Sequence, residues 1–595
     1  MKKLTLLLLM LVTLCCLLPL TVSAAEQSGT CGENLTWTLD DAGTLTISGT
    51  GPMEEYRHYP PWEGSAASVT SIVIEEGVTT ICGSAFYNCS NAVSVSIPDG
   101  ITSIGKGAFS QCAGLTGITI PDSVLTIGES AFYGCSNLTD ITLSSSLSVI
   151  EEAVFHKCST LAGIRIPDSV TTISSQAFSY CSSLTNVILG ANVAEIAPNA
   201  FNECNHLVNF SIGSPNPLLS AQHGVLFDAD LSTLILAPRG IQGHYTIPET
   251  VIDIADSAFT ECNGLSGVTF HSDVSSIGSN AFAYCDNLKD VIIAEGVDAI
   301  GERAFFSCNA LTSITIPGSV LTIGKSAFED CTALTDATLC EGILTIGSDA
   351  FYNCESLREI TIPDSVTELG FGAFCKCYDL TSATVGCGIT ALQYSTFELC
   401  TAMKEVTLPD GLLTIGRYCF QDCGQLTQIT IPDSVTTIEY NAFSTCSEMK
   451  TVIIGSGVSE IQTKAFQLCR NLEKVYFTGN APSFPKNGKG AFDTVTATVY
   501  YPAGNITWTE DVMSQASKGA TLTWVPNFGQ IHPGDLDGDG MVNDVDVARL
   551  LWYTLFPDSY TLNGNADFNG DGMVNDADVA YLLWHTLFPD QYPIN

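Results

Sequence analysis

The middle of this 595-residue chain repeats itself every 23 residues. A phenylalanine recurs at that spacing, and a cysteine follows each one three positions later. A period of about 20 to 29 residues is typical of a solenoid, because a unit that small buries its apolar face only by stacking on its neighbours. The repeated phenylalanines are Phe86, Phe109, Phe132, Phe155, Phe178, Phe201, Phe259, Phe282, Phe305, Phe328, Phe351, Phe374, Phe397, Phe420, Phe443 and Phe466.

The repeat at 311–331 illustrates one unit. Ile314, Thr315 and Ile316 alternate apolar and polar side chains, which predicts a short strand, and Pro317 ends it because proline has no backbone N–H to donate. Stacked strands form a parallel sheet over a continuous core. Residues 70–480 resemble the BspA-like type of leucine-rich repeat found in bacterial surface and secreted proteins, and this resemblance implies an α/β leucine-rich-repeat solenoid.

Twenty-four cysteines in one chain raise the possibility of disulfide bonds, but their spacing favours another interpretation. Sixteen occupy the same repeat position, where a cysteine beside the phenylalanine behaves as a small buried apolar residue. We therefore predict a buried ladder of thiols. Two further cysteines lie in the N-terminal apolar segment, and six lie off the ladder: Cys31, Cys82, Cys340, Cys375, Cys387 and Cys419.

The exposed face of the sheet is predicted to carry a row of threonines with acidic residues beside it. Threonine is a good strand former, so this row is compatible with a plain solvated face, or with a binding surface for a protein or a glycan. Tyr476 is the main aromatic residue there, and this scarcity favours protein ligands. The row comprises Thr119, Thr142, Thr269, Thr315, Thr338, Thr361, Thr384, Thr407 and Thr430, with Asp140, Asp290, Asp336, Glu359 and Glu405 beside it.

The repeat is bounded and interrupted by segments of different pattern. Two alternating stretches around residues 40–43 predict a hairpin that covers the first turn. The gap between Phe201 and Phe259 contains twelve residues more than two periods, which predicts an inserted hairpin. We expect a β cap at 26–69, the solenoid at 70–476 with the insertion at about 213–250, a C-terminal cap at 477–526 and a linker at 527–532.

Near the C-terminus, two twelve-residue segments, 535–546 and 567–578, repeat one calcium-binding pattern. Ca²⁺ prefers six to eight oxygen ligands on a flexible loop, which positions 1, 3, 5, 7, 9 and 12 supply, position 7 through its backbone carbonyl. Gly540 and Gly572 at position 6 allow the sharp bend. The predicted ligands of two Ca²⁺ ions are Asp535, Asp537, Asp539, Met541, Asn543, Asp546, Asp567, Asn569, Asp571, Met573, Asn575 and Asp578.

Each loop leads into one predicted helix, 547–556 and 579–588, that ends before a proline. A loop followed by a single helix, present twice, with Asp at position 12, resembles a type I dockerin over residues 533–595. The resemblance implies a small α-helical module with two EF-hand-like calcium loops that docks onto a cohesin domain of a scaffolding protein, as in cellulosomes. One helix face, with Val547, Leu550, Leu551 and Leu555, and its counterpart Val579, Leu582, Leu583 and Leu587, is predicted to pack the two halves together.

In dockerins, partner choice lies at loop positions 10 and 11 and on the following helix. The opposite helix faces carry a tryptophan and a phenylalanine each, which implies a partner there, although the phenylalanines could instead fold over the helix ends. The predicted cohesin-contacting residues are Asp544, Val545, Leu551, Trp552, Phe556, Asp576, Ala577, Leu583, Trp584 and Phe588.

The N-terminus predicts secretion, since two lysines precede an apolar run and small residues follow it, as in a signal peptide spanning 1–25. No later stretch is apolar and long enough to predict a membrane span. A net charge of −41 makes nucleic acid an unlikely partner. No HExxH, GxSxG or P-loop motif is present, so we expect a non-catalytic binding protein. The alternatives are an adhesin anchored through its dockerin and, less favoured, a polysaccharide-degrading enzyme without a recognisable motif.

Overall fold

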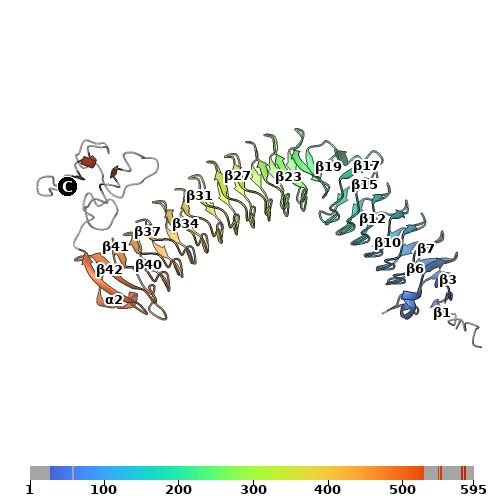
Figure 1. The fold of residues 1–595 in the computed structure, drawn as a ribbon, viewed down its shortest axis with the longest axis horizontal. Helices are drawn as coiled ribbons and strands as arrows, with labels where there is room; N and C mark the ends of the chain where they lie inside the picture. Colours follow the sequence, from blue (N-terminus) through green and yellow to red (C-terminus); the bar gives the residue numbers. More distant parts are fainter. Residues whose placement is uncertain are drawn as a thin grey trace, which may run out of the picture. The chain divides into compact units, whose positions relative to one another are not determined.

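The computed structural model describes residues 27–56, 59–527, 547, 550–551, 578–580 and 582–583. The chain forms two compact units, Met1–Ala310 and Leu311–Asn595. The repeats of each unit are turns of a β-solenoid, in which most turns contribute one strand to a front row and one strand, usually shorter, to a back row (Figure 1). This architecture confirms the predicted solenoid with parallel sheets and a 23-residue repeat.

In the first unit, both rows consist of parallel strands. The front row comprises β5 (Ser71–Ile74), β7 (Ser94–Ser96), β9 (Gly117–Thr119), β11 (Asp140–Thr142), β13 (Gly163–Arg165), β15 (Asn186–Leu189), β17 (Asn209–Ile212), β21 (Gly243–Thr246), β23 (Leu265–Thr269) and β25 (Asp290–Ile292). The back row comprises β4 (Gly51–Pro52), β6 (Val78–Ile81), β8 (Ser103–Ile104), β10 (Thr126–Ile127), β12 (Val149–Ile150), β14 (Thr172–Ile173), β16 (Glu195–Ile196), β20 (Thr233–Leu236), β22 (Asp253–Ile254), β24 (Ser276–Ile277) and β26 (Ala299–Ile300).

The second unit has the same two rows. Its front row comprises β27 (Ser313–Ile316), β29 (Asp336–Leu339), β31 (Glu359–Thr361), β33 (Ser382–Thr384), β35 (Glu405–Thr407), β37 (Gln428–Ile431), β39 (Thr451–Ile454), β41 (Lys474–Phe477), β42 (Thr496–Pro502) and β43 (Thr521–Asn527). Its back row comprises β28 (Thr322–Ile323), β30 (Thr345–Ile346), β32 (Glu368–Leu369), β34 (Ala391–Leu392), β36 (Thr414–Ile415), β38 (Thr437–Ile438) and β40 (Glu460–Ile461).

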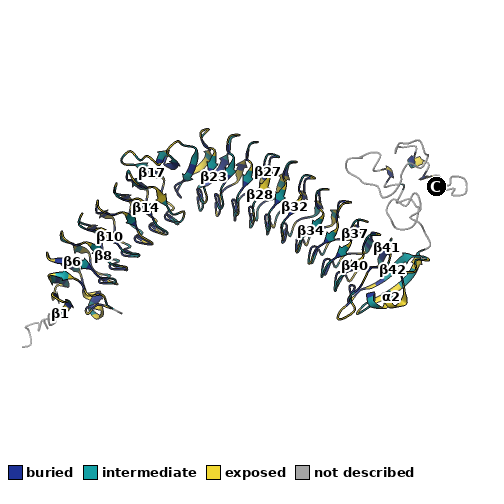
Figure 2. Ribbon diagram, turned by 180° about the vertical axis from the view of Figure 1, so that it is seen from behind, coloured by how far each residue is buried: buried dark blue, intermediate teal, exposed yellow. Residues whose placement is uncertain are grey.

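The apolar positions of each repeat are buried and the residues between them are more exposed, as Figure 2 shows by the change of colour along the strands. In one repeat of the second unit, every apolar position is at most 3% exposed. Parallel pairing in register stacks each of these positions on its counterpart in the next turn, so the core is continuous within the unit. The buried positions are Leu426, Ile429, Ile431, Val435, Ile438, Ala442, Phe443, Cys446 and Met449.

The phenylalanines form stacked ladders inside each unit. In the first unit the centroids of successive rings from Phe86 to Phe201 lie 5.1 to 5.6 Å apart, and Trp62 stacks on the first of them at 6.0 Å. In the second unit the ladder runs from Phe328 to Phe492 with spacings of 5.1 to 5.6 Å. Offset aromatic stacking adds to the stability gained by burial, so the ladder couples each turn to the next.

All sixteen ladder cysteines are buried, as predicted, and no disulfide bond joins cysteines of the described residues. The structure adds a contact that the spacing did not reveal. The thiol donates to the backbone carbonyl of the phenylalanine 26 residues earlier, for example from Cys112 Sγ to Phe86 O at 3.1 Å and from Cys446 Sγ to Phe420 O at 3.2 Å. The thiols that make this contact therefore link two turns as well as filling space, and Cys262 donates instead to Pro238 O at 3.8 Å.

The turn that follows each back-row strand, which we call the turn face, has an unusual backbone. Within it, two residues that flank the ladder phenylalanine have positive φ, such as Asn441 at 56° and Thr445 at 63°. Non-glycine residues rarely adopt this conformation because Cβ meets the backbone. Hydrogen bonds between successive turns offset this cost, including Phe443 N to Ala465 O at 2.7 Å.

At the N-terminal end, β1 (Gln27–Gly32), β2 (Leu35–Leu39) and β3 (Thr44–Gly49) pair antiparallel, and β3 then pairs parallel with β5. The predicted hairpin is therefore present, with Leu39 opposite Leu45. The 3-10 helix η1 (Glu63–Ser68) follows, and Trp62 before it donates from Nε1 to Ala85 O at 2.8 Å. This contact places Trp62 at the start of the phenylalanine ladder.

The inserted segment forms a three-stranded antiparallel meander of β18 (Leu219–Gln222), β19 (Val225–Asp228) and β20. The predicted hairpin corresponds to β19 and β20, and β18 is an additional strand. Arg239, only 2% exposed, lies in the turn that leads out of the meander, in a repeat that carries no ladder phenylalanine. Its guanidinium donates to Pro198 O and Asn202 Oδ1, both at 3.0 Å.

At the C-terminal end, the repeat lengthens before it stops. Phe492 follows Phe466 by 26 residues instead of 23 and stacks on it with the centroids 5.1 Å apart, so the phenylalanine ladder continues one turn into the segment predicted as the C-terminal cap. The cap itself consists of β42 and β43, which extend the parallel front row, with α2 (Glu510–Ala516) between them. The Thr509 side chain caps this helix by accepting from Val512 N at 3.4 Å.

Candidate functional site

Most of the predicted calcium and cohesin residues lie outside the described residues. Asp578, a predicted calcium ligand, is fully buried. Leu550 and Leu582 are also fully buried, as expected for the face that packs the two halves together. Leu551 and Leu583 are 42% and 38% exposed, so they are not buried with that packing face, and their predicted contact with a partner stays a prediction.

The remaining site predictions of that module stay predictions. The calcium ligands outside the described residues are Asp535, Asp537, Asp539, Met541, Asn543, Asp546, Asp567, Asn569, Asp571, Met573 and Asn575. The cohesin-contacting residues outside them are Asp544, Val545, Trp552, Phe556, Asp576, Ala577, Trp584 and Phe588.

The threonine row lies where it was predicted, on the outer face of the front-row strands. In the second unit, Thr361, Thr384 and Thr407 are exposed and follow one another in register. Asp336 pairs with Glu359 in the same way, which brings these two acidic residues side by side on adjacent strands. Parallel rows of this kind form a flat, polar and acidic surface.

Tyr476 does not offer an aromatic platform on this face. Its side chain is only 9% exposed, and its ring stacks on Tyr500 with the centroids 4.7 Å apart. The expectation that Tyr476 is the main aromatic residue exposed on this face is therefore wrong.

Exposed aromatic residues gather instead on the turn face of the second unit. We call Tyr352, Phe371, Tyr394, Tyr418 and Tyr440 the turn-face strip. Phe371 and Tyr394 are 56% and 49% exposed, respectively. Tyr418 makes edge contacts with Tyr394 and Tyr440, with ring centroids 5.4 and 5.5 Å away.

The turn backbone fixes the order of these rings. Asp349 N donates to Phe371 O at 2.8 Å, and Gly372 N donates to Tyr394 O at 2.9 Å, so Phe371 and Tyr394 occupy equivalent places on adjacent turns. Tyr418 N donates in the same way to Tyr440 O at 3.1 Å. The strip is therefore held by the same hydrogen-bond ladder that stabilises the solenoid.

A hollow of about 720 Å³ lies between the first three rings of the strip. Asp349, Lys376 and Glu398 supply its charged groups. The Lys376 ammonium lies 4.8 Å from the ring centroid of Tyr352, and the hydrogen bond to that tyrosine raises the pKa of the lysine, which stays protonated. Burial raises the pKa of Asp349, although Lys325 opposes the shift. The Ser395 side chain is 3% exposed, and its Oγ has no hydrogen-bond partner among the described residues.

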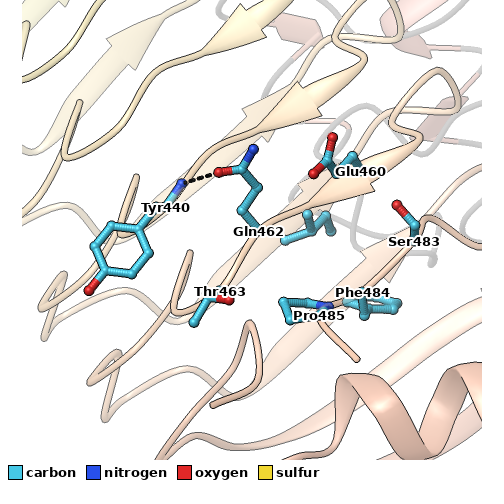
Figure 3. Close-up of a pocket in the computed structure, with 8 residues that line it drawn as sticks. Tyr440, Glu460, Gln462, Thr463, Ser483, Phe484 and Pro485 are labelled. Carbon is cyan, nitrogen blue, oxygen red and sulfur yellow. Dashed lines mark hydrogen bonds between the residues drawn. The ribbon is translucent and has the colours of Figure 1, made fainter. Parts of the chain in front are cut away.

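A second, smaller hollow of about 300 Å³ lies beside Tyr440 at the other end of the strip (Figure 3). Figure 3 shows Tyr440 and Gln462 side by side, with Tyr440 N donating to Gln462 Oε1 at 3.1 Å. Glu460 and Ser483 lie on its other side, above Phe484 and Pro485. Like the first hollow, it combines aromatic surface with hydrogen-bonding groups.

No group of three or more His, Cys, Asp or Glu side chains in the described part of the chain is arranged to hold a metal ion. Among these residues, too, no helix has the length and apolar character that crossing a bilayer requires. The aromatic and polar side chains along the strip can bind a ligand by stacking and by hydrogen bonding.

Comparison with family models identifies both parts of the chain. The BspA type leucine rich repeat region matches residues 64–182, 126–237, 252–381 and 368–496, which together span more than half of the sequence. The chain belongs to this family. The dockerin type I domain matches residues 533–583, so the C-terminal module is a type I dockerin, and domains of that type generally bind calcium. Both matched families are non-catalytic.

Solved structures of bacterial repeat proteins resemble this BspA-type protein. A leucine-rich repeat protein from Bacteroides ovatus is 21% identical over 83% of this chain and 99% of its own, with a TM-score of 0.43. A leucine rich cell surface protein from Faecalibacterium prausnitzii is 29% identical over 60% of this chain and 94% of its own, also with a TM-score of 0.43. No curated protein matches the sequence.

Sequence reasoning missed the turn-face strip. The signal that could have revealed it is the position of these aromatics relative to the ladder phenylalanines. Phe371 and Tyr394 stand three positions before Phe374 and Phe397, and Tyr440 stands three before Phe443. The sequence analysis considered only the strand positions of each repeat and therefore did not include the position three residues before the ladder phenylalanine.

Proposed function

We propose that this protein is a secreted, non-catalytic binding protein that attaches to a cohesin-bearing scaffold through its calcium-dependent dockerin. The scaffold belongs to a cellulosome-like, polysaccharide-degrading assembly, and the solenoid recognises a protein or a glycan. The observation that carries the proposal is the duplicated loop-and-helix segment, 535–546 and 567–578, inside the region that matches the dockerin model. In this division of labour, residues 533–595 attach the protein and residues 70–476 select its ligand.

Two Ca²⁺ ions suit the donor set of the loops. Each loop offers carboxylate and amide oxygens at positions 1, 3, 5, 9 and 12, which are the ligands that a hard cation prefers. Asp578 at position 12 of the second loop is fully buried. Calcium would neutralise part of a module that holds eleven aspartates and one arginine, so its binding contributes to the folding free energy.

The cohesin-facing surface is proposed to include the outer side of the two helices. The exposure of Leu551 and Leu583 supports this choice, because covering an exposed apolar side chain with a partner lowers the free energy. Trp552 and Trp584 follow directly in the sequence, and tryptophan is enriched at the centres of protein interfaces.

The test is titration of the full-length protein with a panel of cohesin domains, in Ca²⁺ and in EDTA. We expect one cohesin to bind in Ca²⁺ and to lose at least about a hundredfold in affinity in EDTA. Asp546→Ala combined with Asp578→Ala should reproduce this loss and reduce calcium binding, whereas Asp558→Ala combined with Asp590→Ala, which removes the same two charges outside the loops, should not. Binding that persists in EDTA, or no binding to any cohesin, would refute the proposal.

A further inference from the structure

The turn-face strip combines two exposed aromatic side chains, Phe371 and Tyr394, with three half-buried ones on the second unit. We propose that it binds a linear, neutral polysaccharide, with the hollow around Phe371 and Tyr394 as its main subsite. This inference rests on the proposed function as a non-catalytic binding protein, and it names the class of ligand that the solenoid takes.

The rings supply the apolar half of such a site. A pyranose sugar has a face of C–H groups and a rim of hydroxyls, so it stacks on an aromatic ring and hydrogen-bonds at its edges. Phe371 and Tyr394 present such rings on adjacent turns, each about half exposed. Because backbone hydrogen bonds hold their turns, binding orders little of the protein, which preserves affinity.

The polar groups around the rings supply the other half. Asp349 and Glu398 offer carboxylate oxygens that accept from sugar hydroxyls, and Lys376 offers a donor. Ser395 also lines the hollow, with its hydroxyl buried below the surface. A few convergent polar groups on a mainly apolar wall are typical of small-molecule sites.

Charge selects a neutral ligand over charged ones. A polyanion would meet Asp349, Glu398 and a chain with a net charge of −41. A basic peptide would meet the Lys376 ammonium, which already covers the face of Tyr352 at 4.8 Å. Placing like charges together disfavours a partner by several kcal/mol. Because the hollow carries both carboxylates and an ammonium, it repels polyanions and basic peptides alike.

The extent of the strip indicates a linear chain rather than a single sugar. Tyr418 and Tyr440 continue the row of aromatic rings across two further turns, with centroid separations of 5.4 and 5.5 Å. The row ends at the second hollow, where Tyr440, Gln462 and Glu460 again combine an aromatic ring with hydrogen-bonding groups (Figure 3). A polysaccharide that follows the turns of the solenoid would contact both hollows.

The experiment uses the full-length protein in calcium buffer. Affinity electrophoresis in gels that contain hydroxyethylcellulose, arabinoxylan or galactomannan, and calorimetry with cellohexaose, xylohexaose and mannohexaose, test neutral ligands. Polygalacturonate and oligolysine test the charged classes. We expect binding to at least one neutral polymer and to neither charged one.

Two variants locate the site. Phe371→Ala combined with Tyr394→Ala should reduce the affinity at least about tenfold, as expected on removing central aromatic contacts. Leu413→Ala, which truncates a side chain that is 48% exposed in the same unit but outside the strip, should leave it unchanged. Circular dichroism and thermal unfolding verify that all variants are folded.

Three results would overturn the inference: no binding to any neutral polymer, binding that the double variant leaves intact, or strip-dependent binding of oligolysine or polygalacturonate. Cohesin binding measured on the same samples separates the two proposals. Retained docking without polysaccharide binding would refute only the ligand assigned to the strip, whereas loss of docking refutes the proposed function itself.

Discussion

Replacing Phe443 by alanine tests whether the phenylalanine ladder holds the turns of the second unit together. Its side chain is fully buried, and its ring centroid lies 5.1 Å from the centroids of both Phe420 and Phe466. Truncation of a buried phenylalanine costs about 3–5 kcal/mol, within which each stacked pair accounts for about 0.5–1.5 kcal/mol. We expect about 4 kcal/mol, because backbone hydrogen bonds on both sides of the turn prevent the cavity from closing.

Native-state hydrogen exchange is the appropriate assay, because a repeat protein opens turn by turn and a single unfolding free energy does not describe it. The reporters are the amides of Phe420 and residue 443, which donate to Ala442 O and Ala465 O, each at 2.7 Å. A loss of about 4 kcal/mol corresponds to protection that falls about a thousandfold at these amides. Protection several turns away should change much less.

Phe371→Ala provides the matched control, because it removes the same side chain from the same unit at a site that is 56% exposed. Its effect on stability should stay within about 0.5 kcal/mol. Phe443→Leu, which keeps most of the volume but abolishes both stacked pairs, should cost about 1–2 kcal/mol. If Phe443→Ala and Phe371→Ala have equal effects, the ladder does not stabilise the solenoid and the reasoning fails.

The buried thiols lead to two further predictions. Burial raises the pKa of Cys89 and Cys375 from 9.0 to about 12, so both thiols stay neutral in the folded protein. The unfolded chain releases these protons first above about pH 9. We therefore expect the melting temperature to be constant up to about pH 8 and to fall steadily above about pH 9, and a rise there would contradict this linkage. In native protein treated with iodoacetamide, mass spectrometry should find Cys387 modified first, since it is exposed, and the ladder thiols only after unfolding in urea.

The periodic part of the fold could be predicted because residues at the same position of successive repeats, which we call a column, share one environment. The column that contains Phe443 and the column that contains Cys446 are both apolar in nearly every repeat, and both are buried throughout. Threonine columns, such as the one with Thr361, alternate with the buried ones and are exposed. Burial therefore follows from the period and from the alternation of each strand.

The backbone of the turn face could not be predicted in the same way. Asn441 and Thr445 have positive φ, a conformation that sequence reasoning assigns to glycine. Here the hydrogen bonds between turns decide the conformation, including Thr445 N to Gln467 O at 2.7 Å. Since these bonds join residues in different repeats, no single repeat contains the information.

The turn-face strip was missed for a related reason. Phe371 and Tyr394 belong to a column three positions before the ladder phenylalanine, Tyr418 to a column two before it, and Tyr352 to a column one after it. Each column taken alone is irregular, and Arg417 stands where the ring of the next turn would be. The rings of Tyr394 and Tyr418 lie in different columns and meet with their centroids 5.4 Å apart, because Ser395 N donates to Arg417 O at 2.9 Å and so aligns the two turns. A surface assembled from several columns is a property of the stacked turns, so ligand sites of solenoids are found from the structure even where the sequence predicts their core.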